Sequence, residues 1–188
     1  MTRKCDAFII GGSAGSLDVL LKVLPDVDVN INFPIIIVVH RMHGADSLLP
    51  ALLSARTKLI VKEADEKEKL IAGTVYIAPS DYHLLIEHDR TFSLDYSEKI
   101  NYSRPAIDAT FQTAAEVYKG RLACLLLSGS NADGVKGLES VKTWGGIALI
   151  QDPESAQVAY MPEQAKQHVA IDRVLAVEDI AEFINLLS

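Results

Sequence analysis

The stretch AFIIGGSAGSLDVLLKVL, residues 7–24, decides the fold class of this 188-residue chain. Its apolar run from Ala7 to Ile10 predicts a buried strand, and leucines recur at helical spacing from Leu17 to Leu24. A glycine-rich turn, residues 11–16, separates the two. A strand, a tight turn and an amphipathic helix in this order favour an α/β fold.

The rest of the chain repeats this alternation. Further strands are predicted at residues 35–39, 59–61, 75–78, 122–127, 147–150 and 174–177, and helices at 45–55, from Pro105 to Gly120, at 135–144, 163–168 and 179–187. Residues 62–69 read as a solvated connection, and residues 82–87 and 91–96 as an antiparallel hairpin appended to the sheet. We therefore predict one domain over residues 1–188, a doubly wound and mainly parallel sheet with helices on both faces.

Composition excludes several classes of protein. The formal net charge is −7 and the lysines and arginines are scattered, which argues against nucleic-acid or anionic-membrane partners. The longest apolar runs are far shorter than the roughly 20 residues that cross a bilayer, so no membrane insertion is expected. Cys5 and Cys124 lie in or beside apolar runs and have no metal-binding spacing. They read as buried thiols of a cytoplasmic protein.

Chemistry-bearing residues follow three of the predicted strands. In an open parallel sheet, sites form beyond the carboxyl ends of the strands. Ser13 follows the first strand, His40 the second, and Asp133 lies in the glycine-rich loop after residues 122–127. The sequence therefore predicts a hydroxyl, an imidazole and a carboxylate at one rim.

The turn around Ser13 supports two interpretations. Residues 11–15 have the G-x-S-x-G form of a nucleophile elbow, in which a serine hydroxyl stands clear at a helix N-terminus. A serine there could equally cap the helix or belong to a phosphate-binding loop. The loop is not a dinucleotide fingerprint, because Ser13 and Ser16 stand where its second and third glycines would be. The turn alone leaves both interpretations open.

The other two residues also have structural alternatives. His40 could be a general base or a hydrogen-bonded core histidine. The spacing His40-x-x-His43-x-x-Asp46 only weakly suggests a metal site. His83 is a rival base, less favoured because it enters the predicted hairpin instead of the rim. Asp133 could cap the following helix, orient an imidazole, or do both.

A set of short motifs, in order along almost the whole chain, carries a family resemblance. They are IIGGSAG (9–15), IVVH (37–40), VYIAP (75–79), RPAID (104–108), LSG (127–129), Asp133-Gly134, Gly145-Gly146, QDP (151–153) and Met161-Pro162. The chain resembles the catalytic domain of the CheB protein-glutamate methylesterases.

The resemblance assigns roles by position. It implies Ser13 as nucleophile, His40 as general base and Asp133 as the acid that orients the imidazole. It also implies that the backbone N–H of Ser130 helps to bind the oxyanion. No metal or cofactor is implied. The chain departs from the family pattern at Ser130, where methionine is usual, and at Ser16, where a second glycine is usual.

The implied function is hydrolysis of glutamate γ-methyl esters on the cytoplasmic helices of chemoreceptors, with release of methanol. Receptor glutamine deamidation at the same site is a further expectation. Because the first predicted strand begins at Ala7, we expect no receiver domain before it, and regulation by a separate partner. The alternatives are a non-catalytic phosphate- or nucleotide-binding module and a degenerate relative that acts only as an interaction partner.

Overall fold

Buried strands form the central layer of the molecule. The computed structural model describes residues 4–41 and 48–188. The main strands are β1 (Ala7–Gly12), β2 (Ile35–Val39), β3 (Ile60–Glu63), β4 (Thr74–Ile77), β7 (Leu122–Leu126), β8 (Ile147–Gln151) and β9 (Arg173–Leu175). They form a seven-stranded sheet in the order β3-β4-β2-β1-β7-β8-β9, and every pairing in it is parallel. Every residue of β1, β2 and β7 is buried, as a sheet covered on both faces requires.

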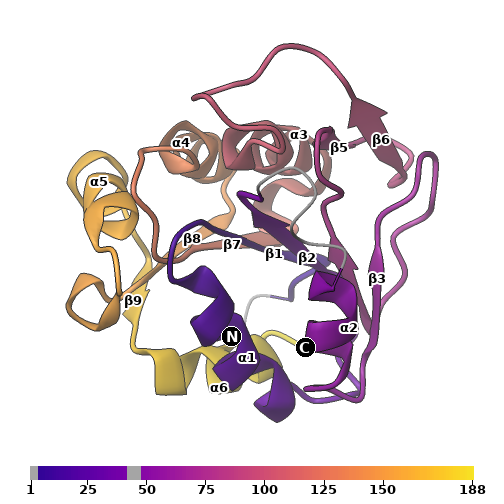
Figure 1. The fold of residues 1–188 in the computed structure, drawn as a ribbon, viewed down its shortest axis with the longest axis horizontal. Helices are drawn as coiled ribbons and strands as arrows, with labels where there is room; N and C mark the ends of the chain where they lie inside the picture. Colours follow the sequence, from indigo (N-terminus) through magenta and orange to yellow (C-terminus); the bar gives the residue numbers. More distant parts are fainter. Residues whose placement is uncertain (1–3, 42–47) are drawn as a thin grey trace.

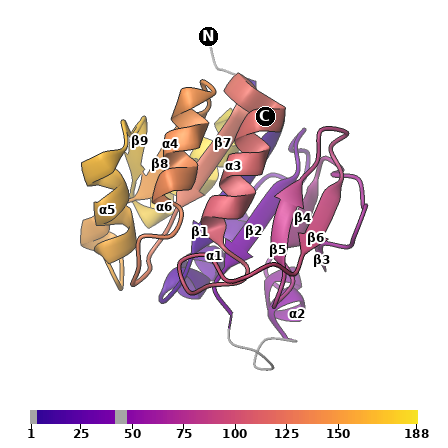
Figure 2. The same cartoon turned by 90° about the horizontal axis from the view of Figure 1, so that it is seen from above.

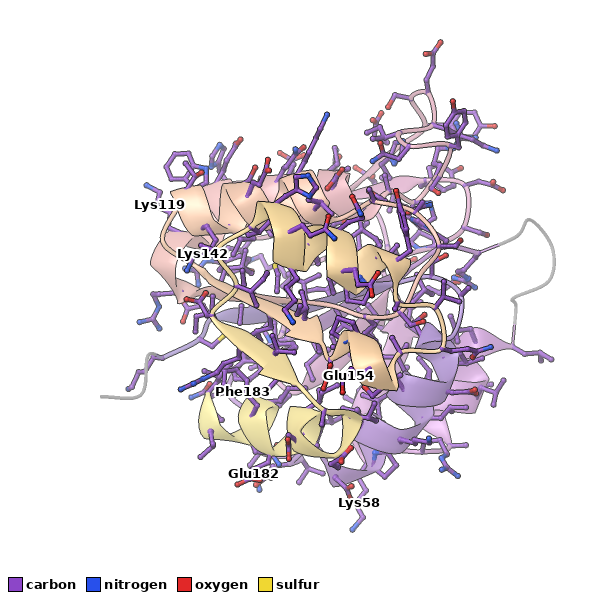
Figure 3. The ribbon with its side chains drawn as sticks, turned by 90° about the vertical axis from the view of Figure 1, so that its left-hand side faces the viewer. Lys58, Lys119, Lys142, Glu154, Glu182 and Phe183 are labelled. Atoms are coloured by element: carbon purple, nitrogen blue, oxygen red, sulfur yellow. The ribbon has the colours of Figure 1, made fainter. Side chains whose placement is uncertain are left out.

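Helices cover both faces of this sheet (Figures 1 and 2). One face carries α1 (Ser16–Val23), α2 (Leu49–Ser54) and α6 (Val177–Leu186); the other carries α3 (Ile107–Tyr118), α4 (Val135–Thr143) and α5 (Tyr160–His168). Figure 3 shows the layers from the side, with Lys119 and Lys142 at the layer of α3 and α4 and Glu182 and Phe183 on α6. The predicted doubly wound fold is confirmed.

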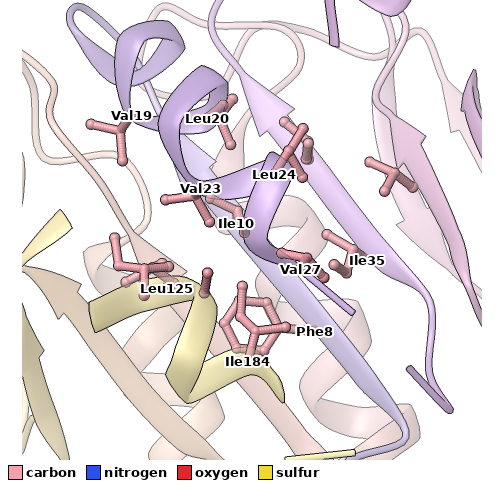
Figure 4. Packing of buried hydrophobic residues seen from close by; sticks show 14 of the residues in the cluster. Phe8, Ile10, Val19, Leu20, Val23, Leu24, Val27, Ile35, Leu125 and Ile184 are labelled. Carbon is pink, nitrogen blue, oxygen red and sulfur yellow. The ribbon is translucent and has the colours of Figure 1, made fainter. Parts of the chain in front are cut away.

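The period of two along each strand divides the apolar residues between two cores. Phe8 and Ile10 point to one side of β1 and pack with Leu20 of α1 and Ile184 of α6 (Figure 4). Ile9 points to the other side and joins the cluster beneath α3 and α4. Burial of one such side chain contributes about 1.5–3 kcal/mol, so both helical layers are firmly attached to the strands that carry the candidate site.

The predicted hairpin exists, but it forms a two-stranded sheet that is separate from the main one. Its strands are β5 (His83–Ile86) and β6 (Phe92–Asp95). The hairpin is attached to α3 instead: the Thr110 hydroxyl donates to the Leu84 carbonyl at 2.7 Å, and the Ile86 N–H donates to the Thr113 hydroxyl at 3.0 Å.

The connection over residues 62–69 is more ordered than predicted. Lys62 and Glu63 complete β3. Further on, the Lys67 N–H donates to the Phe92 carbonyl at 2.8 Å, and the Phe92 N–H donates to the Glu68 carbonyl at 2.9 Å. Mixed charge predicted solvation, but the backbone groups of this segment pair with the edge of the hairpin.

Several element ends differ from the prediction. The last strand ends at Leu175 instead of residue 177, because Ala176 is already the N-cap of α6. α5 begins at Tyr160, not residue 163, since Pro162 fits the first turn of a helix. Pro105 precedes α3, whose N-cap is Ala106. Of the helix predicted over residues 45–55, the first three residues lie outside the described part, and α2 starts at Leu49.

The sheet order identifies where a site should lie. β1 is the middle strand, β2 flanks it on one side and β7 on the other. The chain therefore leaves β1 in one direction and later returns to its opposite side, which makes a topological switch point at the carboxyl end of β1. Ser13, His40 and the loop that carries Asp133 follow these three adjacent strands.

Candidate active site

Ser13 follows the central strand in a turn that has room only for glycine at two positions. A Cβ on Gly12 would lie 2.5 Å from the Ser16 Cβ. Gly15 has φ +83°, and a Cβ there would lie 2.7 Å from the Gln157 Cβ. Both distances are below normal contact, so the glycines of the turn are fixed by packing and by backbone conformation.

Backbone and hydroxyl contacts hold this turn without using the Ser13 hydroxyl as a cap. The Ser13 N–H donates to the Ser128 carbonyl at 2.9 Å, and the buried Ser128 hydroxyl donates to the Ala14 carbonyl at 2.7 Å. Ser16 donates its N–H and its hydroxyl to the Ser13 carbonyl, at 3.0 and 2.6 Å. The N-cap of α1 is Gly15, which has no side chain that could cap the helix. The turn thus accommodates Ser16 where the family pattern has glycine.

His40 lies next to Ser13 across two neighbouring strand ends. Gly12 pairs with Val39 in the parallel register, and the His40 N–H donates to the Gly12 carbonyl at 3.2 Å. Ser13 and His40 are therefore the next residues on strands that run about 4.8 Å apart. Both line one small hollow of about 110 Å³, together with Leu17 and Leu20.

Asp133 is in direct contact with His40. The His40 Nε2 lies 2.7 Å from the Asp133 Oδ2, although the two residues are 93 positions apart in the chain. The Asp133 side chain is completely buried, whereas 12% of the His40 side chain is exposed. Because a carboxylate only accepts hydrogen bonds, Nε2 carries the proton of this contact. In the neutral ring Nδ1 is then the unprotonated nitrogen, able to accept a proton.

Four N–H groups surround the Asp133 carboxylate. Besides His40, the Oδ2 accepts the Ile107 N–H at 2.7 Å. The Oδ1 accepts the Asp108 N–H at 3.0 Å and an Asn101 side-chain N–H at 3.2 Å. Burial raises the pKa of the Asp133 carboxyl, but the hydrogen bonds from His40, Asp108 and Ile107 outweigh burial and hold that pKa below its usual value. The carboxylate is therefore anionic beside His40.

The capping alternative for Asp133 takes an unexpected form. The N-cap of α4 is Gly134, in a left-handed conformation and without a side-chain capping bond. Asp133 instead accepts N–H groups from Ile107 and Asp108, the first two residues of α3. It thus stabilises the start of a different helix while it contacts His40.

Ser130 is exposed beside the serine turn. Its neighbour Gly129 packs so closely against Ser13 that a Cβ on Gly129 would lie 3.1 Å from the Ser13 Cβ. Within residues 4–41 and 48–188, no acceptor is hydrogen-bonded to the Ser130 backbone N–H. In that part of the chain the amide thus has no protein acceptor, a property that an oxyanion donor requires.

His83 is a structural histidine of the core. It is fully buried; its Nδ1 accepts the Ala106 N–H at 3.1 Å, and its Nε2 donates to the Glu98 carbonyl at 2.8 Å. Both ring nitrogens are therefore occupied, and the rival base is excluded from the rim. His43 and Asp46 of the weak metal pattern lie outside the described residues. In the described part of the chain, no three His, Cys, Asp or Glu side chains gather to hold a metal.

Four polar residues around the site have no role in the prediction from the sequence. Asn101 and Asp108 contact Asp133 directly, and Ser128 holds the serine turn. The buried Gln151 supports the serine turn through Ser128, since its Oε1 accepts the Ser128 N–H at 3.1 Å. The motifs quoted above include Asp108, Ser128 and Gln151, and this was the signal in the sequence that could have identified them. Their contacts depend on how the loops approach one another in three dimensions.

The sequence of this chain matches a known protein family and individual relatives. The family model "CheB methylesterase" matches residues 8–184. A Leptospira interrogans protein named "Putative protein-glutamate methylesterase/protein-glutamine glutaminase" is 43% identical over 182 residues, covering 96% of this chain and 94% of the relative. A Thermotoga maritima protein-glutamate methylesterase/protein-glutamine glutaminase is 37% identical over 177 residues, covering 93% of this chain and 52% of that protein.

The structural comparison agrees. The crystal structure of the Thermotoga maritima CheB methylesterase catalytic domain matches with a TM-score of 0.94 and 36% identity, over 98% of this chain and all of that one. No helix in the described part of the chain is both long and apolar enough to cross a bilayer. The resemblance inferred from the motifs is confirmed, and the chain belongs to the CheB methylesterase family.

Proposed function

We propose that this chain is a serine esterase that removes methyl groups from glutamate γ-methyl esters on methylated chemoreceptors and releases methanol. Ser13, His40 and Asp133 are its catalytic residues. The observation that carries the proposal is the 2.7 Å contact between His40 Nε2 and Asp133 Oδ2, one strand away from Ser13. The family model and the relatives named as methylesterases support the choice of substrate.

The first half-reaction forms an acyl-enzyme. The Ser13 hydroxyl attacks the ester carbonyl carbon, and its proton passes to the His40 Nδ1, which the contact to Asp133 leaves unprotonated. The imidazolium that forms lies against a buried anionic carboxylate. Orientation of an imidazole by such a carboxylate is worth about 10⁴ in rate in the serine proteases.

The Ser130 N–H would stabilise the tetrahedral intermediate. Negative charge develops on the former carbonyl oxygen, and a backbone donor fixed in advance lowers the energy of that charge. Loss of one such donor typically costs about 10²–10³ in rate. Because the donor is main chain, a serine can serve here where the family pattern has methionine.

Loss of methanol completes the first half-reaction and leaves Ser13 acylated. The intermediate collapses and breaks the bond to the methoxy oxygen, which takes the proton from His40 and leaves as methanol. In the second half-reaction His40 removes a proton from a water molecule, and the water oxygen attacks the acyl carbon. The bond from that carbon to the Ser13 oxygen then breaks, the Ser13 oxygen takes the proton back from His40, and the glutamate side chain leaves as a free acid that ionises to the carboxylate. Each proton is thus carried by the same ring nitrogen.

Deamidation of glutamine would pass through the same acyl-enzyme. The leaving group is then ammonia instead of methanol, and the deacylation step is identical. The double names of the relatives, methylesterase and glutaminase, support extending the proposal to this reaction. We further propose that the substrate lies on the cytoplasmic helices of receptors, since the free, buried thiols of Cys5 and Cys124 suit a reducing compartment.

Methanol release tests the proposal. Membranes that carry methylated receptors are incubated with the wild-type chain or with Ser13→Ala, and only the wild type should release methanol. A fluorophosphonate probe should label Ser13 in the wild type and much less in His40→Ala. Equal release by Ser13→Ala, or a wild type that binds nucleotide and never reacts with the probe, would contradict the esterase assignment.

A further inference from the structure

Asp108 and Asp133 tie together the starts of two helices. The Asp108 N–H, in the first turn of α3, donates to the Asp133 Oδ1 at 3.0 Å. In return, the Asp108 Oδ1 accepts the backbone N–H groups of Gly134 and Gly137 at the start of α4, at 2.9 and 2.7 Å. Both carboxylates are buried. Since Gly134 directly follows Asp133, Asp108 fixes the backbone from which the proposed catalytic carboxylate projects.

Asn101 joins the two carboxylates from a third segment. Its side-chain nitrogen lies 2.9 Å from the Asp108 Oδ2 and 3.2 Å from the Asp133 Oδ1. A side-chain amide nitrogen has two hydrogens, so each carboxylate can receive one of them. Both neighbours of this nitrogen are acceptors, which fixes the orientation of the amide. The neutral bridge also reduces the repulsion between two negative groups that are close together.

The backbone around Asn101 is shaped to present this amide. Ile100 and Ser103 exchange two backbone hydrogen bonds, at 3.1 and 2.9 Å, and enclose a two-residue turn. The turn residues Asn101 and Tyr102 have φ of +51° and +63°. Asparagine tolerates this left-handed conformation better than most residues do.

We propose that Asn101 and Asp108 are positioning residues for the esterase reaction: together they hold Asp133 where its Oδ2 meets the His40 ring. This inference rests on the proposed function for its catalytic consequence. Neither residue touches the reacting atoms in this scheme, and both act through Asp133. None of the roles assigned from the family resemblance includes them.

Asp108 also acts on the site through its charge. All three of its side-chain contacts are to N–H donors, as expected for an ionised carboxylate. Burial, and then the charge of Asp133, raise the pKa of Asp108 above its usual value. A second negative charge beside Asp133 stabilises the imidazolium that His40 forms during the reaction. Removing that charge should therefore slow the reaction.

The other charged groups near His40 are constant in this experiment. Arg41, Asp81, Lys99 and Arg104 line a hollow together with His40. In the network itself, the titratable groups that face one another are His40, Asp133 and Asp108. A difference in the pH dependence of kcat/KM between wild type and an Asp108 variant therefore reports the loss of the Asp108 carboxylate.

Asp108→Asn is the first test variant. It keeps the size of the side chain and an oxygen for Gly134 and Gly137, but it removes the charge and turns an NH₂ group toward that of Asn101. We expect kcat for methanol release to fall about 10- to 100-fold, the scale on which second-layer hydrogen-bond partners act in metal sites, with KM within about twofold. The midpoint of the kcat/KM profile should move to lower pH, which a loss of folded protein alone would not cause.

Asn101→Gly is the second variant, for the case in which Asp108→Asn does not fold. Glycine keeps the left-handed turn and removes only the bridging amide. We expect kcat to fall about tenfold with KM unchanged, and the double variant to be no worse than Asp108→Asn. Lys67→Gly is the matched control, because Lys67 also has a left-handed conformation, with φ +62°, and its N–H donates to the Phe92 carbonyl in the hairpin. Its kcat should equal that of the wild type.

The NMR signal of the His40 ring proton that faces Asp133 separates failure of this inference from failure of the proposed function. The signal is assigned from its loss in His40→Ala, and observing it requires no turnover. If the wild type releases methanol but the variants keep its kcat, and this signal is unchanged in them, positioning by Asn101 and Asp108 is overturned and the esterase stands. If the wild type releases none, a displaced or lost signal in Asp108→Asn still supports the network, and an unchanged signal overturns it.

Discussion

Ser13 packs against Gly129, where the backbone carries no side chain. A methyl group on Gly129 would lie 3.1 Å from the Ser13 Cβ and 2.5 Å from the Met161 Cε. Met161 is itself fully buried, and its N–H donates to the Gly129 carbonyl at 3.0 Å. The serine turn and the start of α5 thus meet across one glycine, and residue 129 sets the position of the proposed nucleophile.

Gly129→Ala should therefore displace Ser13 or Met161. We expect a fall of at least about tenfold in methanol release, and a loss of about 1–3 kcal/mol in the free energy of unfolding, as in other overpacked sites. Steady-state kinetics and urea unfolding measure the two effects. Gly120→Ala is the control, because among the residues that the structure describes its added Cβ would meet only the Gly145 carbonyl oxygen, at 3.5 Å. Wild-type kinetics in Gly129→Ala would show that the contact yields without moving Ser13.

Asp133→Asn should damage both the reaction and the fold. Donors face both oxygens: His40 and Ile107 on one, Asp108 and Asn101 on the other. An amide NH₂ must therefore face a donor in either orientation. We expect a fall of about 10⁴ in methanol release, by analogy with the serine proteases, and about 1–3 kcal/mol of destabilisation.

A simple capping role for Asp133 predicts a different result, because asparagine caps helices about as well as aspartate. Asp152→Asn provides that comparison, since Asp152 caps the short helix η3 (Pro153–Ser155) by accepting the Glu154 N–H at 3.0 Å. The Asp152→Asn variant should release methanol at the wild-type rate. Near-normal turnover in Asp133→Asn would remove Asp133 from the catalytic scheme.

Asp6 should make stability depend on pH. Its carboxylate pairs with Arg121 and, at 3.4 Å, with Arg90. The hydrogen bond from Arg121 is the main cause that holds its pKa below the usual value. A carboxyl whose pKa is lower in the folded state stabilises the fold above its unfolded pKa, near 3.9, and loses that contribution as pH falls through the lowered value.

We therefore expect Asp6→Asn to be less stable than the wild type by up to about 1 kcal/mol at pH 7, since both arginines are half exposed. The difference should shrink below about pH 4. Urea unfolding at a series of pH values from 7 down to 3 measures it. A difference that stays constant over this range would show that Asp6 acts through packing and not through its charge.

Cys5 and Cys124 should be inert in the folded protein. Both thiols are buried, and burial raises the pKa of Cys5 to about 12 and that of Cys124 well above its usual value. The thiolate is the reactive form, so Ellman's reagent at pH 8 should react with neither in the native state and with both in guanidinium chloride. Rapid reaction of a native thiol would indicate local opening of the sheet.

The strands at the centre of the sheet could be predicted because their burial leaves a direct trace in the sequence. Residues 7–10 and 35–39 are wholly apolar, and a fully covered parallel strand has no polar face to show. A residue that directly follows such a strand lies at the rim of the sheet. The rim position of Ser13 and His40 could therefore also be predicted. Parallel pairing then brought the two together.

The partners of Asp133 could not be predicted in the same way. Whether Asp133 caps α4 or α3 depends on how closely two helix starts approach, and no local pattern encodes that distance. Asn101 lies in an exposed turn, and only its side chain reaches inward. The predicted end of the last strand, beyond Ala176, was wrong for a related reason: an apolar residue fits both the end of a strand and the start of a helix.

Ser13 and His40 precede the hairpin of β5 and β6 in the chain, and Asp133 follows it. This order has a practical consequence. A break in the chain between β5 and β6 would leave the hydroxyl and the imidazole on one fragment and the carboxylate on the other, although β1 pairs with β7 along its length. Neither piece could hydrolyse an ester by the proposed triad. Turnover would return only when the pieces reassociate, so esterase activity in this fold would serve as a reporter of fragment complementation.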